Sequence, residues 1–161
     1  MNGEVINNQL NFKEMNNEKI VNGLNDLLAK NYDSERGYQH AAKESNSPLL
    51  TSFYRGHSSR RNAFGHEIKD LISECGGTPK KGTSILGDIH NAWIDVKTAF
   101  SSDKEEALLE AVETGEEACL KDYDAFLKME DLPANIVRTI SRQRNQVAGA
   151  LNKVEMYEEQ H

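Results

Sequence analysis

Cysteine, proline and long apolar runs are all scarce in this sequence of 161 residues, which contains 2 cysteines and 3 prolines. No segment approaches the roughly 18 consecutive apolar residues of a membrane-spanning helix. The first residues, Met1-Asn2-Gly3-Glu4, have neither the basic leader nor the apolar core of a signal peptide. We therefore expect a cytoplasmic protein with no membrane partner.

Basic residues are also in deficit, because 19 lysines and arginines stand against 26 aspartates and glutamates, for a formal net charge of -7. Nucleic-acid binding depends on positive surfaces that attract phosphates, so we expect no nucleic-acid partner. The chain also lacks a glycine-rich phosphate loop, a nucleophile elbow and a zinc-finger spacing. These absences predict no catalytic residue and no cofactor-binding residue.

The two cysteines, Cys75 and Cys119, lie far apart and form no C-x-x-C motif. Each falls on an apolar helical stripe, where a free cysteine behaves as a small buried hydrophobe. We expect two buried free thiols, and a disulfide between them is the alternative.

From Asn17 onward, apolar residues recur at steps of three and four, the pattern of a helix with one buried face. They predict a first helix over about residues 17–45. Ser47 and Pro48 follow, and these residue types favour the start of a new helix. The second helix should end at Gly76-Gly77, because glycine favours the residue after a helix end.

The second half repeats this plan. Ser102-x-x-Glu105 has the spacing of a capping box and predicts the start of a third helix. Asp131-Leu132-Pro133 predicts a short turn, after which a fourth apolar stripe continues to about Glu158. The two halves therefore predict two antiparallel helix hairpins.

Residues 80–101 connect the hairpins and contain a further helical pattern over residues 84–96. A connection of this length can cross a bundle from end to end, as in ferritin-like folds. The sequence thus predicts an all-α, ferritin-like four-helix bundle with a helical crossover between the second and third helices. An up-down-up-down bundle with an extra short helix is the alternative.

Several separated motifs in the chain resemble a bacterial four-helix-bundle family of unknown function in the ferritin-like superfamily. They are Gly76-Gly77-Thr78-Pro79, Gly87-Asp88-Ile89-His90-Asn91-Ala92-Trp93, Glu113-Thr114-Gly115-Glu116-Glu117, Tyr123 and Leu132-Pro133. The resemblance implies a ferritin-like fold and no assigned activity. It covers a single domain at residues 17–158, and residues 1–16, whose first part shows no apolar period, form an N-terminal tail outside it.

Each predicted stripe is interrupted near its middle by polar residues such as Glu35, His57 and Glu116. A buried charge is costly unless it is paired, so this polar layer needs an explanation. Ferritin-like di-iron proteins hold at this level one Glu from each of two helices and a Glu-x-x-His motif from each of the other two. Glu35 and Glu116 or Glu117 fit the single-Glu role, but both Glu-x-x-His motifs are absent.

Two interpretations of this layer are open. In the first, which we favour, arginines such as Arg61 neutralise Glu35 and Glu116, no cofactor binds, and the layer fixes helix register. It predicts a non-enzymatic protein of structural or interaction type, for which the superfamily suggests an association with stress. In the second, Glu35, His57, Glu116 and Glu117 bind iron or another divalent metal, in a metal-binding protein or di-iron oxidoreductase with a degenerate ligand set.

Leu49, Leu50, Phe53 and Tyr54 give the start of the second helix more apolar surface than one core-facing stripe requires. Surplus apolar surface often marks an interface. We therefore expect a homodimer, and the sequence does not identify any other protein partner.

Overall fold

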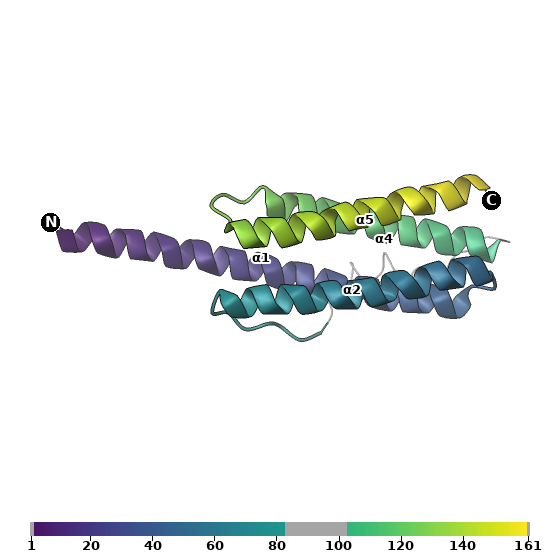
Figure 1. Ribbon diagram of the computed structural model, residues 1–161, viewed down its shortest axis with the longest axis horizontal. Coiled ribbons are helices and arrows are strands. Elements are labelled where there is room, and N and C mark those ends of the chain that lie inside the picture. Colours follow the sequence, from purple (N-terminus) through teal and green to yellow (C-terminus); the bar gives the residue numbers. More distant parts are fainter. Residues whose placement is uncertain (1, 83–102, 161) are drawn as a thin grey trace.

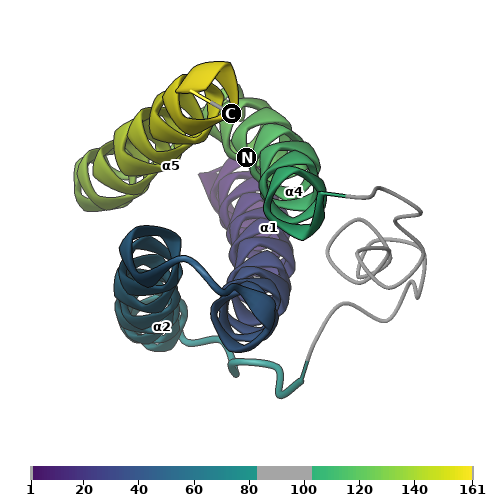
Figure 2. The ribbon, with the colours of Figure 1, turned by 90° about the vertical axis from the view of Figure 1, so that its right-hand side faces the viewer.

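The computed structural model describes residues 2–82 and 103–160, which form four helices and no strand. The helices lie along one long axis (Figure 1) and are α1 (Asn2–Glu44), α2 (Pro48–Glu74), α4 (Lys104–Leu127) and α5 (Ala134–Gln160). In a view along that axis, α1 lies beside α2 and α4, and α5 closes the ring (Figure 2). This arrangement confirms the predicted all-α four-helix bundle. No described helix has the length and apolar character needed to cross a bilayer.

The first hairpin joins α1 to α2 where the sequence predicts. The Ser47 hydroxyl accepts a hydrogen bond from the Leu50 amide at 3.2 Å and caps α2, whose first residue is Pro48. The helix ends at Glu74, and Gly76, two residues later, has a positive φ of 77°. The Gly77 amide donates to the Ile72 carbonyl in the last turn at 3.0 Å. A left-handed glycine of this kind satisfies carbonyl groups that the helix end leaves free.

The start of α4 differs from the prediction by one residue. Asp103 rather than Ser102 caps the helix, and its carboxylate accepts hydrogen bonds from the Glu105 amide at 3.0 Å and from the next amide at 3.2 Å. The Glu105 carboxylate instead accepts hydrogen bonds from the Ser45 hydroxyl and the Asn46 amide, both at 2.7 Å. These bonds attach the start of α4 to the turn between α1 and α2.

The segment between α2 and α4 has to connect opposite ends of the bundle. The end of α2 lies at the same end of the bundle as the α4–α5 turn, whereas α4 begins at the opposite end (Figure 1). The first residues after α2 run back along α1, where the Asn25 side chain accepts from the Lys80 amide at 2.8 Å and donates to the Thr78 carbonyl at 3.3 Å. The predicted crossover helix, with His90 and Trp93, lies outside the described residues.

The first helix is longer than predicted, because α1 begins at Asn2 rather than near residue 17. Its N-terminal part projects beyond the bundle (Figure 1), and burial begins only at Ile20. Five large apolar side chains in this projection are between 51% and 73% exposed: Val5, Ile6, Leu10, Phe12 and Met15. The expected tail is thus helical but makes no contribution to the core.

Two apolar clusters fill the bundle. One includes Leu24, Ile68 and Phe126, and the other includes Leu50 and Val154. Along α1, α2 and α4, the polar layer lies between these clusters.

The apolar start of α2 is divided between core and surface. Leu50 and Tyr54 are buried, Phe53 is half-buried, and Leu49 is 62% exposed. The surplus apolar surface is therefore smaller than the sequence suggests, and the homodimer stays a prediction.

Both cysteines are free. Cys119 is buried as expected, whereas Cys75 is only half-buried because it caps the end of α2.

Candidate functional site

The polar layer is a set of polar side chains at the middle of the bundle, to which all four helices contribute. Most of them are joined by hydrogen bonds and ion pairs, and Ser34 and Cys119 contact each other beside them. Its buried members are Asn31, Ser34, Arg61, Glu116, Cys119, Tyr123 and Gln143. Each lies on the face of its helix that also carries core residues, so these helices necessarily bring the polar groups together. We call this set, with Glu67, the polar chain.

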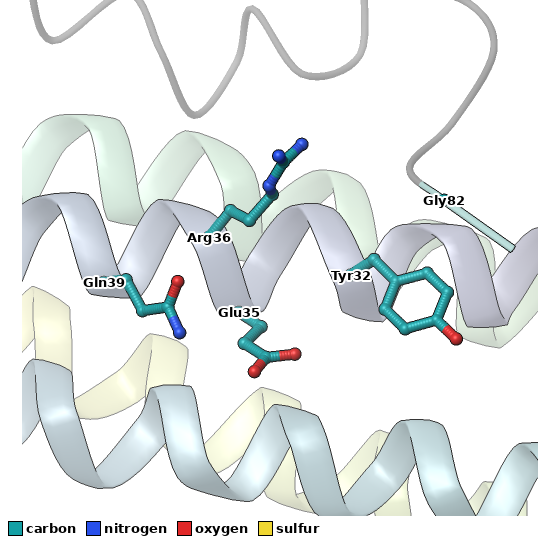
Figure 3. Close-up of a pocket in the computed structure, with 5 residues that line it drawn as sticks. All are labelled: Tyr32, Glu35, Arg36, Gln39 and Gly82. Carbon is teal, nitrogen blue, oxygen red and sulfur yellow. The ribbon is translucent and has the colours of Figure 1, made fainter.

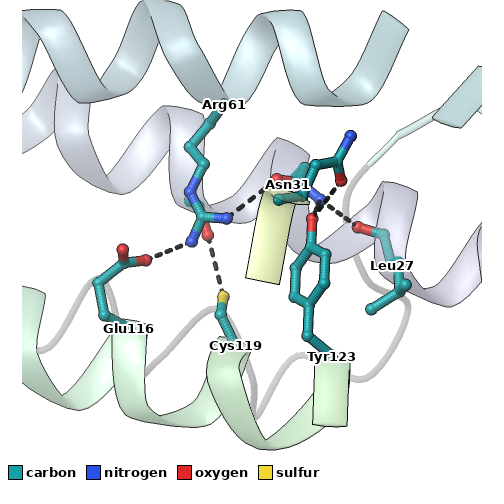
Figure 4. A network of polar contacts seen from close by, with 8 residues as sticks. Leu27, Asn31, Arg61, Glu116, Cys119 and Tyr123 are labelled. Carbon is teal, nitrogen blue, oxygen red and sulfur yellow. Dashed lines mark hydrogen bonds and ion pairs between the residues drawn. The ribbon is translucent and has the colours of Figure 1, made fainter. Parts of the chain in front are cut away.

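Arg61 of α2 is the centre of the polar chain (Figure 4). Its guanidinium, only 2% exposed, forms an ion pair with the fully buried Glu116 of α4. A second guanidinium nitrogen donates to the Asn31 side-chain carbonyl of α1 at 3.1 Å. Arg61 therefore connects α2 to its hairpin neighbour α1 and to α4 across the bundle. The predicted neutralisation of Glu116 by an arginine is present.

Asn31 and Tyr123 extend these contacts to α5. The Asn31 amide group donates to the Tyr123 hydroxyl and to the Leu27 carbonyl, each at 2.8 Å. The Tyr123 hydroxyl in turn donates to the Gln143 side-chain carbonyl at 2.7 Å. The Asn31, Tyr123 and Gln143 side chains thus form an unbroken donor–acceptor series from α1 through α4 to α5.

The polar chain reaches the surface between α2 and α5. The Gln143 amide group donates to the Phe64 carbonyl at 3.3 Å and to the Glu67 carboxylate at 3.4 Å. Glu67 also forms an ion pair with Arg142, and both of these side chains are more than a third exposed. The contacts thus run from a dry ion pair at Glu116 to a solvated one at Glu67.

Burial and charge set the ionisation of the polar chain. Burial acts to lower the pKa of Arg61, but Glu116 and the nearby Cys119, Tyr123 and Tyr38 together act more strongly, so that the pKa of Arg61 is raised. Burial raises the pKa of Tyr123, and burial together with the neighbouring Glu116 raises the pKa of Tyr38. Burial likewise raises the pKa of the Cys119 thiol, which lies 3.1 Å from the Ser34 hydroxyl. These shifts keep the tyrosines and the thiol neutral, so the polar chain contains no activated nucleophile.

The four predicted metal ligands occupy different environments. Glu116 pairs with Arg61, and Glu117, the next residue of α4, is exposed. Glu35 points from α1 toward α2 (Figure 3) and accepts a hydrogen bond from the Asn62 side chain at 3.1 Å. It lines a surface pocket of about 350 Å³ rather than the core. Its predicted pairing with an arginine is therefore wrong.

His57 lies among aromatic rings instead of in the polar chain. Its ring centroid is 4.4 Å from that of Phe53 and 5.4 Å from that of Tyr38, with which it stacks. Burial, together with Arg60, Arg61 and Lys153, lowers the pKa of His57 to about 4. In residues 2–82 and 103–160, no three His, Cys, Asp or Glu side chains form a group that could hold a metal ion.

Sequence reasoning did not place Tyr123 or Glu67 in the polar layer. The Tyr123 hydroxyl donates to Gln143 inside the core, and Glu67 connects Gln143 with the surface. The position of Tyr123 four residues after Cys119 on the same stripe was the available signal, because such spacing places both on one helix face.

Comparison with known proteins agrees with this architecture. A family model described as a domain of unknown function (DUF2383) matches residues 19–129. No curated protein gives a significant match. Among solved structures, a mutant of Mycobacterium smegmatis Dps1 is similar, with a TM-score of 0.71, 14% sequence identity, and coverage of 89% of this chain and 97% of that chain. This likeness concerns the fold alone and supports a ferritin-like bundle, while the family match shows that the chain belongs to the DUF2383 family.

Proposed function

We propose that this chain is a non-enzymatic four-helix-bundle protein of structural or interaction type, in which the polar chain fixes how the two hairpins pack. The buried Arg61 guanidinium carries the proposal, because it contacts Glu116 of α4 and Asn31 of α1 at once. If α4 moved by one turn relative to α2, Arg61 and Glu116 would each remain buried without a partner of opposite charge. The ion pair therefore favours one register of the two hairpins.

The residues at this level do not fit the di-iron centre that the ferritin-like fold implies. Such a centre needs carboxylates and imidazoles that converge on two cations. Here Glu116 faces a permanent guanidinium cation, His57 stacks on Tyr38, and Glu35 bonds to a surface asparagine. A metal ion beside Arg61 would place two cations together in a dry core.

Metal content tests the proposal. We expect protein purified without chelator to contain far less than one metal ion per chain. Its melting temperature should not change with EDTA, because a bound ion would stabilise the native state by its own binding free energy. Elemental analysis and thermal melts provide these measurements.

Two carboxylate variants sharpen this test. Glu116→Gln should be destabilised equally with and without EDTA, and Glu117→Gln, which changes an exposed carboxylate, should melt like the wild type. Stoichiometric iron or manganese that is lost in both variants, together with a wild-type melt that depends on EDTA, would contradict the proposal. It would favour the alternative, a metal-binding protein or oxidoreductase that uses Glu35, His57, Glu116 and Glu117.

A further inference from the structure

A groove of about 280 Å³ lies on the surface between the first half of α2 and the last half of α5. These two helices pack less closely than any other neighbouring pair in the described bundle. The groove is open to solvent and approaches the lower end of the volume range typical of small-molecule sites. It is separate from the polar chain.

One wall of the groove is aromatic. Phe53 contacts His57 at a centroid distance of 4.4 Å and Tyr157 of α5 at 5.3 Å. Tyr38 stacks on His57 from the core side and supports the cluster from behind. The Phe53 and Tyr157 rings meet edge to face, with an interplanar angle of 76°, and form a supported aromatic corner against which another ring could pack.

Two cations border this aromatic wall, Arg60 from α2 and Lys153 from α5. Both are exposed, and neither forms an ion pair within the described part of the chain. In a protein with a net charge of -7, two cations that converge without a carboxylate partner make this groove a local site for negative charge.

A glycine leaves space in the groove between these features. Gly56 lies in the interior of α2, where glycine costs about 1 kcal/mol relative to alanine. A Cβ added at Gly56 would have no atom within 4 Å, so packing in this chain does not require the glycine. Its effect is to keep the groove open beside Phe53 and Arg60.

We propose that this groove binds a small organic anion with a flat aromatic body, whose charged group lies between Arg60 and Lys153 and whose ring packs on Phe53 and Tyr157. The volume accommodates a compact ring system rather than a folded partner. The two cations, Arg60 and Lys153, favour an anion as the ligand. The aromatic wall favours an anion that carries a ring over a free inorganic anion. This inference goes beyond the proposed structural role and does not depend on it.

The test uses 2-naphthoate as the probe, with the neutral 2-naphthalenemethanol and the ring-free acetate as matched compounds. Isothermal titration calorimetry of the full chain should give saturable 1:1 binding of naphthoate, at least tenfold tighter than either matched compound. Equal affinity for the neutral alcohol, or no saturable naphthoate binding, would overturn the proposal.

Two pairs of variants locate the site. Gly56→Leu should abolish naphthoate binding by filling the groove, whereas Gly149→Leu should not, although Gly149 is also an exposed helical glycine at which an added Cβ would have no atom within 4 Å. Arg60→Gln should weaken binding at least fivefold, and Arg138→Gln, a change of an exposed arginine elsewhere, should leave it unchanged. Unchanged binding in Gly56→Leu, or equal losses within either pair, would overturn the proposal; circular dichroism confirms that each variant is folded.

Discussion

Arg61 has the largest of the fully buried side chains in the described residues. The free-energy cost of burying its charge depends on the groups that it contacts. A buried charge is penalised by the loss of water, and Glu116 and Asn31 replace part of that solvation. The energetic effect is asymmetric. Removal of one partner leaves a buried charge unpaired, whereas removal of both can leave an ordinary apolar core.

The variant Arg61→Met should therefore lower the free energy of unfolding by about 3–5 kcal/mol, because Glu116 would keep a buried charge without a cation. The double variant Arg61→Met/Glu116→Leu should recover most of this loss, since apolar residues of similar volume can replace a buried ion pair. Urea unfolding followed by circular dichroism at pH 7 measures both values.

The matched control is the surface pair Arg144–Asp124, whose nitrogen and oxygen lie 2.7 Å apart. Arg144→Met should change the free energy of unfolding far less than Arg61→Met does, as for other exposed pairs. If Arg61→Met were as mild as this control, the polar chain would not determine the packing of the hairpins.

Glu158 gives a prediction of how the stability of the protein depends on pH. Burial, together with the neighbouring carboxylates of Glu113, Glu110 and Glu155, raises the pKa of Glu158 from 4.5 to about 7. Between these values the folded protein holds a proton that the unfolded chain releases, so the contribution of Glu158 to stability falls as pH rises through 7. Glu158→Gln, which cannot ionise, should melt like the wild type near pH 4 and above it at pH 8.

The size of this effect should stay below about 1 kcal/mol, because Glu158 is only partly buried and solvent screens its interactions with the neighbouring carboxylates. Glu159→Gln removes the same charge from the exposed neighbouring residue and should not reproduce the pH dependence. The lowered pKa of His57 has the opposite effect on stability, because stability is lost as the pH falls from 6.5 toward 4. This effect is common to the wild type and both variants, so it cancels in the differences between them. A constant difference between Glu158→Gln and wild type at all pH values would contradict the assignment.

At the scale of the helices, the sequence predicted ends where local chemistry marks them. Ser47-Pro48 and Gly76-Gly77 act through their own hydroxyl, ring and backbone freedom, so their roles are independent of distant contacts. The start of α4 was misplaced because Ser102 and Asp103 each precede a glutamate by three residues, and spacing alone does not distinguish them.

The start of α1 was missed for a different reason. Apolar periodicity reports which face of a helix is buried, and the projecting residues of α1 pack against nothing in the described part of this chain. A solvated helix carries no such signal. Glu35 was misassigned because it lies four residues after the buried Asn31, but it stands at the edge of the stripe, where Ser34 is buried and Glu35 is only half-buried.

At the scale of the whole molecule, two hairpins pack through α1 against α4 and α2 against α5 (Figure 2). The polar chain contacts all four helices, whereas each apolar cluster fills one part of the length. The exposed apolar surface is concentrated elsewhere: among the described residues, five of the eight strongly exposed large apolar side chains belong to the projecting part of α1. Exposed apolar surface that is gathered on one element favours association.

We therefore expect the predicted homodimer to form through the projecting part of α1 rather than through Leu49. Sedimentation velocity of the full chain should show a species of about twice 18.1 kDa at high concentration. A variant that lacks residues 2–16 should sediment as a folded monomer, because burial begins only at Ile20. Leu49→Gln should remain a dimer. Dimers that persist in the deletion variant but are lost in Leu49→Gln would return the interface to the start of α2, and a full chain that is monomeric at every concentration would exclude the dimer.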